Sequence, residues 1–596
     1  MVLLLVSGSL AIAVWFAWGL LLRALLVRVG FAPSARVSLD ALALPGLAAL
    51  TTLAACASLA VPLGPGALVA LCLPLVALFF RPLRPVARAD LTRLATWAAS
   101  WGPVLWLLFA LFAAIALWYA TGTARNFDSG LYHLSAIDWV ARYRVVPGLA
   151  NLHPRLGFNN QWFLLVALLR LPWPSGPVDA VNTALYLVLL TWGLDGLARL
   201  RTRRATLSAV WRIVGLVVLV GDTKAYLSPE TLILQLSSPS PDNPVMLVAW
   251  WVLGECLERA EATERTLDMD AVLPAFVAVV AVTLKLAVAP LGLAALWLLW
   301  ARDWSVRRSR VLVALGALAV LPWLARNWIL SGWPLYPLPI LSIGHPDWQA
   351  PTYELALQRA TITAWARQPG TYYDTVLHLK TSEWLAPWWD KRASFDRIAL
   401  CMIMASPVLL LLAWLVGRVA KARWTGVLRE AAGHALVFSI MAFVGSLYWF
   451  KNAPDPRFGY GFLVPAAVAG LLPWTLPLVK RWGRTAPAVV VLALAFYGVR
   501  ADVGWEASSR WWRPAPYPTE PASAIKSWSM PGLSMPVSAT NQCWTHPPPC
   551  TCSDCFNPRW EARGASLADG FRLRGEGPAA DEHDPFFGRT IPAEYR

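Results

Sequence analysis

The sequence predicts an all-α polytopic membrane protein, and three observations lead to that fold class. Of its 596 residues, 57% are hydrophobic and only 14% are charged, whereas about a quarter of a soluble protein is charged. Apolar runs near the length of a bilayer span recur along most of the chain. Arg and Lys gather in short connections between those runs, the pattern of the positive-inside rule. The net charge of +16 therefore indicates membrane topology, and we expect no nucleic-acid partner.

The basic connections define the expected order of the spans. We assign to the cytoplasm residues 23–36, 81–93, 199–204, 259–265, 302–310, 418–429 and 480–484. The larger outward-facing segments are then residues 121–177, 222–242, 328–396 and 448–458, with a tail at 501–596. This alternation predicts roughly fourteen spans within residues 1–500. The first apolar run, residues 2–22, has no charged segment before it, so we expect a retained span and not a cleaved signal.

The region from 121 to 197 must cross the membrane once for this alternation to hold. Its apolar piece 158–171 is short and ends in Leu-Pro-Trp-Pro-Ser-Gly-Pro. We expect a half-buried or interfacial helix there and the crossing at 178–197. Several of the 35 tryptophans stand at the ends of apolar runs, where indoles commonly anchor at the headgroup level; these are Trp101, Trp173, Trp323 and Trp449.

The first large outward segment carries the densest group of polar residues. It reads Asn-Phe-Asp-Ser-Gly-Leu-Tyr-His over 126–133, directly after an apolar run. Tyr132, His133 and Trp139 follow Asp128 at helical spacing, which predicts an amphipathic helix along the membrane. A carboxylate at that position could deprotonate an acceptor hydroxyl or amine, or it could simply be solvated.

His153 and Arg155 follow a Pro-Gly turn in the same segment. Arg155 could hold a phosphate through two parallel hydrogen bonds. Asp128, His133 and His153 would also form an acceptable set of metal ligands, although their spacing matches no standard motif. We therefore assign no metal and no other cofactor, and a divalent ion stays an alternative, as does simple ordering of the loop.

Two charged residues mark later outward turns. Asp242 follows Ser-Pro-Ser-Pro at the start of an apolar run, where it could cap a helix or contact a sugar. Lys285 stands alone between two short apolar stretches. An isolated charge near a membrane is a candidate for function, here neutralising a lipid phosphate, unless it reaches the interface to be solvated.

Two further outward turns add basic and aromatic side chains. Arg326 and Asn327 form a candidate phosphate clamp, followed by a Trp/Tyr/Pro run containing Tyr336 that could line a sugar or prenyl site. Arg457 lies in the turn at 448–458. Lys285, Arg326 and Arg457 come from three different turns, and together they indicate an anionic head group bound at the outer surface.

The tail is polar and Pro-rich and contains four of the eight cysteines. Its outward location favours disulfides over a zinc knuckle. Four cysteines allow three pairings, and a short Cys543–Cys550 loop is sterically reasonable. The other two are Cys552 and Cys555.

The assembled pattern resembles the GT-C superfamily of integral-membrane glycosyltransferases over residues 100–460. Asp128 is similar to the acidic motif of their first outer loop, Asp242 to their second acidic site, and Arg457 to a late basic residue. The first-loop motif in that superfamily is often Asp-Glu, whereas Ser129 follows Asp128 here. The motifs Tyr-His-Leu at 132–134 and Leu-Tyr-Pro at 335–337 are also similar to those of a group of bacterial polytopic membrane proteins without an assigned activity.

The resemblance implies a GT-C-like helical bundle and a transferase in the bacterial inner membrane with an extracytoplasmic active face. Such an enzyme would move a sugar from a polyprenyl-phosphate carrier to a glycan, lipid or protein, with Asp128 as base and inversion at the anomeric carbon. The alternatives are a transporter or flippase of a lipid-linked glycan, and a polysaccharide polymerase or ligase. A transporter would place charges at the membrane midplane in related halves, and the sequence has no evident internal repeat.

Overall fold

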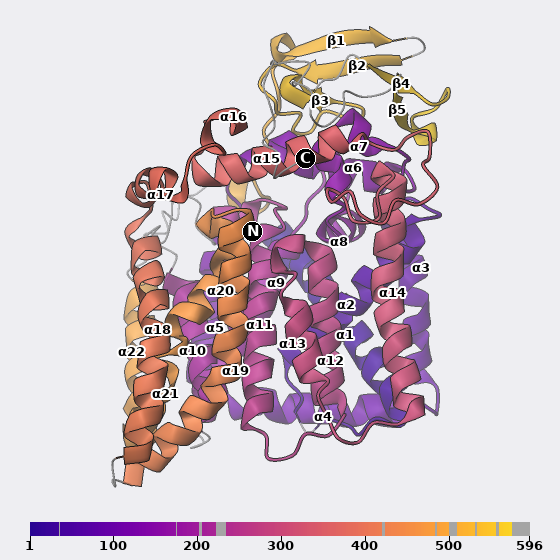
Figure 1. The fold of residues 1–596 in the computed structure, drawn as a ribbon. Helices are drawn as coiled ribbons and strands as arrows, with labels where there is room; N and C mark the ends of the chain where they lie inside the picture. Colours follow the sequence, from indigo (N-terminus) through magenta and orange to yellow (C-terminus); the bar gives the residue numbers. More distant parts are fainter. Residues whose placement is uncertain are drawn as a thin grey trace.

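The computed structural model shows a bundle of membrane-crossing helices with a small β-rich unit on one end (Figure 1). It describes residues 1–34, 36–174, 176–201, 205–221, 234–419, 423–482, 485–499, 509–530, 533–555 and 559–574. Most of the expected outward segment 222–242 therefore lies outside the described residues. The all-α polytopic body predicted from the sequence is present.

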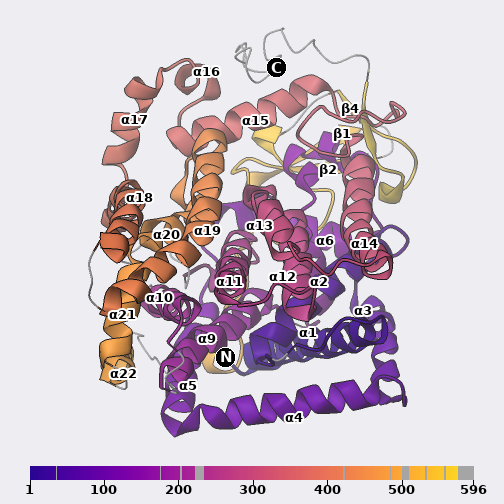
Figure 2. The ribbon, with the colours of Figure 1, turned by 60° about the horizontal axis from the view of Figure 1, so that its bottom comes forward.

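The first part of the bundle is built from residues 2–120. The chain runs through α1 (Val2–Arg28), α2 (Leu39–Ser58), α3 (Pro65–Cys72) with the 3-10 segment η1 (Leu73–Phe79), α4 (Arg84–Ser100) and α5 (Gly102–Ala120). α4 lies across the end of the bundle opposite the β-rich unit (Figures 1 and 2). A buried ion pair fastens it there, because Arg23 Nε of α1 lies 2.8 Å from a carboxylate oxygen of Asp90.

The remaining helices of the bundle come from residues 181–499. They comprise α9 (Val181–Arg201), α10 (Leu207–Gly221), α11 (Asp242–Glu261), α12 (Met269–Leu284), α13 (Leu291–Leu298), α14 (Val306–Ser331), α18 (Ser394–Val419), α19 (Arg423–Asn452), α20 (Pro456–Ala469), α21 (Leu472–Trp482) and α22 (Thr485–Val499). Three outer helices join α14 to α18, namely α15 (Thr352–Arg367), α16 (Tyr373–Val376) and α17 (Thr381–Asp390).

Seven of the described helices are long and apolar enough to span a membrane, or up to nine if each sharply bent pair counts as one span. The expectation of roughly fourteen exceeds that number because several bundle helices are short or charged. α10 and α12 are apolar but have only 15 and 16 residues. α11 ends in a buried ionic cluster at the end of the bundle opposite the β-rich unit; it joins Arg36, Asp40, Asp195, Arg199, Arg212, Glu255 and Glu258.

The segment after α5 folds over one end of the bundle and differs from expectation at one helix. It contains the π-helical turn η2 (Ser129–His133), α6 (Leu134–Arg142), α7 (Leu149–Leu152), the 3-10 turn η3 (Pro154–Phe158) and α8 (Trp162–Leu169). The expectation of a half-buried or interfacial helix at 158–171 is wrong, since every residue of α8 is buried. The bundle itself surrounds this eight-residue helix, which packs against α2 and α6.

Three of the four tryptophans expected at the headgroup level are instead packed inside the protein. Trp101, Trp323 and Trp449 are buried, and only Trp173 is well exposed. The Trp449 indole donates to the carbonyl of Asp455 at 2.7 Å. These three rings therefore pack inside the protein, and Trp449 also makes a hydrogen bond there.

The tail forms two small sheets that rest on the segment after α5 (Figure 1). β1 (Ile525–Met530), β2 (Leu533–Ser538) and β3 (Thr551–Cys552) form one, and β4 (Trp560–Ala562) pairs with β5 (Phe571–Leu573) in the other. The contact is close: Phe571 N–H donates to the Pro147 carbonyl, and Cys543 N–H to the Gly130 carbonyl. Gly148 has a positive φ (69°), and a Cβ at this position would overlap the Phe571 carbonyl oxygen, so both the backbone conformation and the close contact favour glycine.

This docking leads to a topology prediction. The tail and the loop containing Asp128 should lie on the same, non-cytoplasmic side, because they touch and because basic connections favour the opposite side. Single cysteines placed at exposed Ser553 and at exposed Phe127 should both react with a membrane-impermeant thiol reagent in whole spheroplasts. Protection of either one until the membrane is broken would contradict the assigned orientation.

Candidate functional site

Four charged side chains from distant parts of the chain meet at the end of the bundle that carries the tail. Asp128 directly precedes η2, Asp242 begins α11, Lys285 follows α12, and Arg457 lies in the first turn of α20. Arg457 Nη2 lies 3.5 Å from Asp128 Oδ2, and Lys285 Nζ contacts Asp242 Oδ1 directly. We call these four residues the charged centre.

Local breaks in the helices present these side chains. Lys285 has an extended backbone (φ −162°, ψ 129°) between α12 and the 3-10 turn η6 (Leu286–Val288), so its ammonium leaves the helix axis. Asp455 caps α20 by accepting from Arg457 N–H at 3.1 Å, which places Arg457 in the first turn. Pro456 at the first helical position fits the same start.

Asp242 is held by a buried network, and it does not cap its helix. Asn182 of α9 donates to the carbonyls of Ser238 and Ser240 at 2.9 and 2.8 Å, which fixes the turn before α11. Pro241 occupies the cap position, and the side chain of Asp242 pairs with Lys285. The pairing leaves Asp242 only 6% exposed, so it is the less accessible of the two carboxylates.

Asp128 is the accessible acid of the charged centre. Its side chain keeps 24% of its surface exposed, compared with 5% for Asp242. Its backbone N–H donates to Asn126 Oδ1 at 2.9 Å, which orders the turn before η2. The Asp128 carboxylate is therefore the more solvent-accessible acid of the charged centre.

Aromatic rings enclose the two cations. Lys285 Nζ lies 4.4 Å from the ring centre of Phe458, and the guanidinium of Arg457 lies 4.7 Å from the same ring. Trp365 of α15 covers Arg457 at 4.6 Å. These cation–π contacts hold the cations without consuming their charge, so both remain able to attract an anion.

His133 lies within electrostatic range of all four members of the charged centre. Burial lowers its pKa to about 4, although the negative charges of Asp128 and Asp242 act in the opposite direction. Its Nδ1 is 3.4 Å from Ser129 Oγ, which also bonds Ser238 Oγ at 2.6 Å. The imidazole is therefore neutral at physiological pH and acts as a hydrogen-bonding group there.

Three residues expected to bind the substrate have structural partners elsewhere. Arg326 donates to Asn159 Oδ1 at 2.9 Å and to Ser58 Oγ at 2.6 Å. Asn327 donates to the Pro334 carbonyl, and the Tyr336 hydroxyl to the Pro154 carbonyl, both at 3.0 Å. Asn327 and Tyr336 therefore brace the outer loops and do not line the charged centre.

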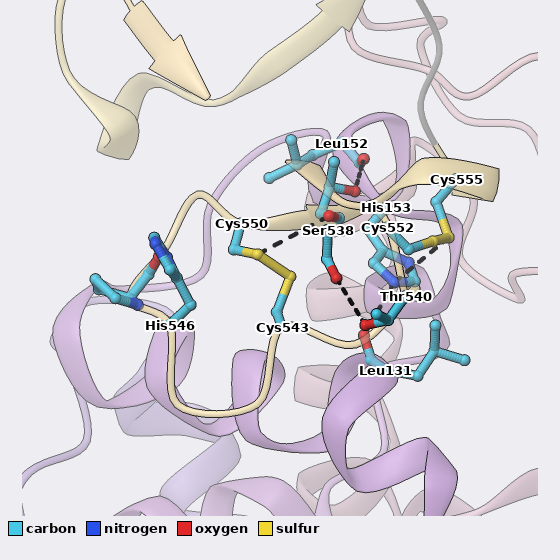
Figure 3. The surroundings of a disulfide bond; sticks show 12 residues. Leu131, Leu152, His153, Ser538, Thr540, Cys543, His546, Cys550, Cys552 and Cys555 are labelled. Atoms are coloured by element: carbon cyan, nitrogen blue, oxygen red, sulfur yellow. Dashed lines mark hydrogen bonds between the residues drawn. A yellow bond between two sulfur atoms is a disulfide. The ribbon is translucent and has the colours of Figure 1, made fainter. Parts of the chain in front are cut away.

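His153 belongs to the interface with the tail, so it does not join Asp128 and His133 in the alternative set of metal ligands. Its Nε2 lies 3.2 Å from the Leu131 carbonyl and 3.6 Å from Cys555 Sγ (Figure 3). Among the described residues, the only group near enough for one metal ion is His153 with Cys552 and Cys555, within 4.8 Å. Those two sulfurs are bonded to each other in this structure, so they do not offer thiolate ligands.

The tail cysteines form two disulfides, Cys543–Cys550 and Cys552–Cys555 (Figure 3). We expect mass mapping of non-reduced protein to yield a linked peptide containing Cys543 and Cys550. Alkylation of all four tail cysteines in freshly isolated protein, or one zinc per chain, would contradict the oxidised state. Cys256, buried in α11, is the internal control that should stay reduced.

Sequence reasoning missed several residues of the site. Trp365 and Phe458 cover the cations, and Asp455 lies 4.0 Å from Arg457 Nε. Burial raises the pKa of Asp455, against the opposing charge of Arg457. The run Asp-Pro-Arg-Phe was visible at 455–458, and an acid one residue before a helical Pro is a helix-start signal that could have identified Asp455.

The fold and the charged centre define a polytopic α-helical membrane protein with two acids and two cations gathered at the end that bears the tail. The chain belongs to the family described as a domain of unknown function, DUF8201, whose match covers residues 1–464. That range includes all four residues of the charged centre and ends before the tail. No curated protein and no solved structure matches the chain.

Proposed function

We propose that the protein is a GT-C-type membrane glycosyltransferase that takes a sugar from a polyprenyl-phosphate carrier at the extracytoplasmic face of the bacterial inner membrane. The observation that carries the proposal is the charged centre. It combines an accessible acid, Asp128, with two cations, Lys285 and Arg457, at one end of a membrane bundle. Base and phosphate-binding groups must be neighbours for such a transfer.

The residues would divide the work as follows. An Asp128 oxygen removes the proton from the acceptor hydroxyl or amine. The acceptor atom then forms a bond to the anomeric carbon while the bond from that carbon to the carrier phosphate oxygen breaks. The electron pair leaves with the phosphate, whose charge Lys285 and Arg457 stabilise. One displacement from the face opposite the leaving group inverts the anomeric configuration.

The 3.5 Å contact between Arg457 and Asp128 also suggests an order of events. A donor phosphate competes with Asp128 for the guanidinium, since arginine binds phosphate through two parallel hydrogen bonds. Donor binding would release Asp128 from its ion pair and leave it free to act as a base. Asp242 would keep Lys285 in position throughout.

A transporter or flippase of a lipid-linked glycan would use the same cations. It is the weaker proposal because the charged centre lies at helix ends, at the starts of α11 and α20 and after α12. Transporters bind their cargo near the midplane, between discontinuous helices. A polymerase or ligase would change the acceptor and keep the same charged centre.

The test is turnover by the purified full-length protein with a panel of polyprenyl-phosphate sugars and mixed glycan, lipid and peptide acceptors. We expect release of the polyprenyl phosphate together with a glycoside of inverted anomeric configuration. Translocation of the intact donor across proteoliposomes, without release of the carrier, would replace this proposal by the flippase.

A further inference from the structure

A second cationic site lies apart from the charged centre and is built around Arg326. This side chain in α14 is only 3% exposed. Both of its described partners, Asn159 and Ser58, are neutral, and no carboxylate pairs with it within the part of the chain described. A buried charge without a counter-charge is costly, so this arrangement indicates a missing anion.

The cavity beside Arg326 has the chemistry of an anion site. Arg155 of η3 and Arg144 also line it, Arg144 from an exposed position at its mouth. Asn160 lines it too, 9% exposed, and its amide has no hydrogen-bond partner among the residues that the structure describes. No aspartate or glutamate of the described chain contributes to the lining.

The rest of the cavity wall is apolar, so the ligand should carry an apolar part as well as an anionic group. Trp139 of α6, Phe163 of α8 and Leu330 of α14 line the same cavity. α14 borders the membrane, because only 28% of its most apolar stretch is buried in the protein. A ligand with an anionic head and an apolar body would satisfy both the arginines and this wall.

We propose that the cavity between α6, η3 and α14 binds the phosphate group of a membrane lipid, with Arg326 and Asn160 as its innermost contacts. Arg155 and Arg144 add positive charge toward the opening. The proposal rests on this cavity alone and holds whether or not the charged centre transfers a sugar. A lipid held there would brace the loop from η2 to η3, on which the tail rests.

The experiment uses full-length protein in a neutral detergent, titrated with short-chain phosphatidylglycerol and, in parallel, with inorganic phosphate, and analysed by native mass spectrometry. We expect a one-to-one lipid adduct. Arg326→Gln should weaken it by roughly tenfold or more, since a charge-assisted contact is lost. Asn160→Ala should weaken it by about threefold to tenfold, and it should fold normally because the only described hydrogen bond of Asn160 is through its backbone carbonyl, which accepts from Phe163 N–H and is kept in alanine.

Two controls separate this site from others. Arg259→Gln removes a buried arginine that donates to the carbonyls of Thr266 and Trp300 at the far end of α11. Arg392→Gln removes an arginine outside both sites, which donates to the Trp388 carbonyl at 3.0 Å. Both should leave the lipid affinity unchanged. Unchanged affinity in Arg326→Gln and Asn160→Ala, or an equal loss in either control, would overturn the proposal. Equally tight binding of inorganic phosphate would overturn its lipid part.

Discussion

Replacing Asp128 by Asn should lower the turnover of sugar transfer by roughly two to four orders of magnitude, the usual contribution of a positioned general base. The amide keeps nearly the same shape and cannot accept the acceptor proton. Donor binding should survive, because Lys285 and Arg457 remain, and Arg457 loses a competing partner at 3.5 Å. The test is to measure both turnover and donor affinity on the same preparation of the variant.

Asp138→Asn is the matched control for this variant. Asp138 lies ten residues further along the same outer segment and pairs with Arg170 at 2.7 Å, away from the charged centre. Its loss should leave turnover within about twofold, because the ion-pair partners of Asp138 are Arg170 and Arg142, which are not members of the charged centre. An Asp128→Asn protein with near-normal turnover would remove Asp128 as the base, and Asp242→Asn would then be the variant to assay.

Much of the charged centre could be predicted because its members stand at helix ends, which charge and apolarity mark in a sequence. Asp242 and Lys285 are isolated charges beside apolar runs, and Arg457 follows a turn. The alternation of basic connections placed all three on the same side as Asp128. The sequence does not show which acid pairs with which cation, because that pairing depends on how non-consecutive helices pack.

The assignment of Arg326 shows that limit. Its position in an outward turn was as suggestive as that of Lys285, but α14 lies beside α2 and η3. The Arg326 side chain therefore bonds Ser58 and Asn159 and does not pair with Asp242. The expectation of an interfacial helix at α8 was wrong for a related reason. Its composition and length suit an interface, and only the packing of the surrounding bundle buries it.

The strands of the tail could not be predicted from the sequence pattern either. Their residues do not alternate cleanly between apolar and polar, and several prolines interrupt the segment. The two disulfides and the backbone contacts with Pro147 and Gly130 hold these short strands. Long-range contacts of this kind leave almost no local signal.

Replacing Lys285 by Met should destabilise the protein by about 3 kcal/mol, because it leaves Asp242 buried without its counter-charge. Asp242 has only 5% of its side chain exposed, while Lys285 retains 20%, so we take the lower end of the range for a broken buried pair. Met conserves the length of the side chain and its contact with Phe458. The measurement is the apparent unfolding temperature in detergent, at one scan rate for all variants.

A double variant identifies the cause of that loss. Asp242→Asn with Lys285→Met removes both charges, so most of the stability should return. Lys451→Met, at an exposed position in the last turn of α19, is the surface control and should change stability by no more than about 0.5 kcal/mol. Donor affinity should stay low in the double variant, because the phosphate has lost Lys285 as a contact. If the double variant is as unstable as Lys285→Met alone, the pair does not hold this end of the bundle together. Normal donor affinity in that variant would leave Arg457 as the sole phosphate contact of the charged centre.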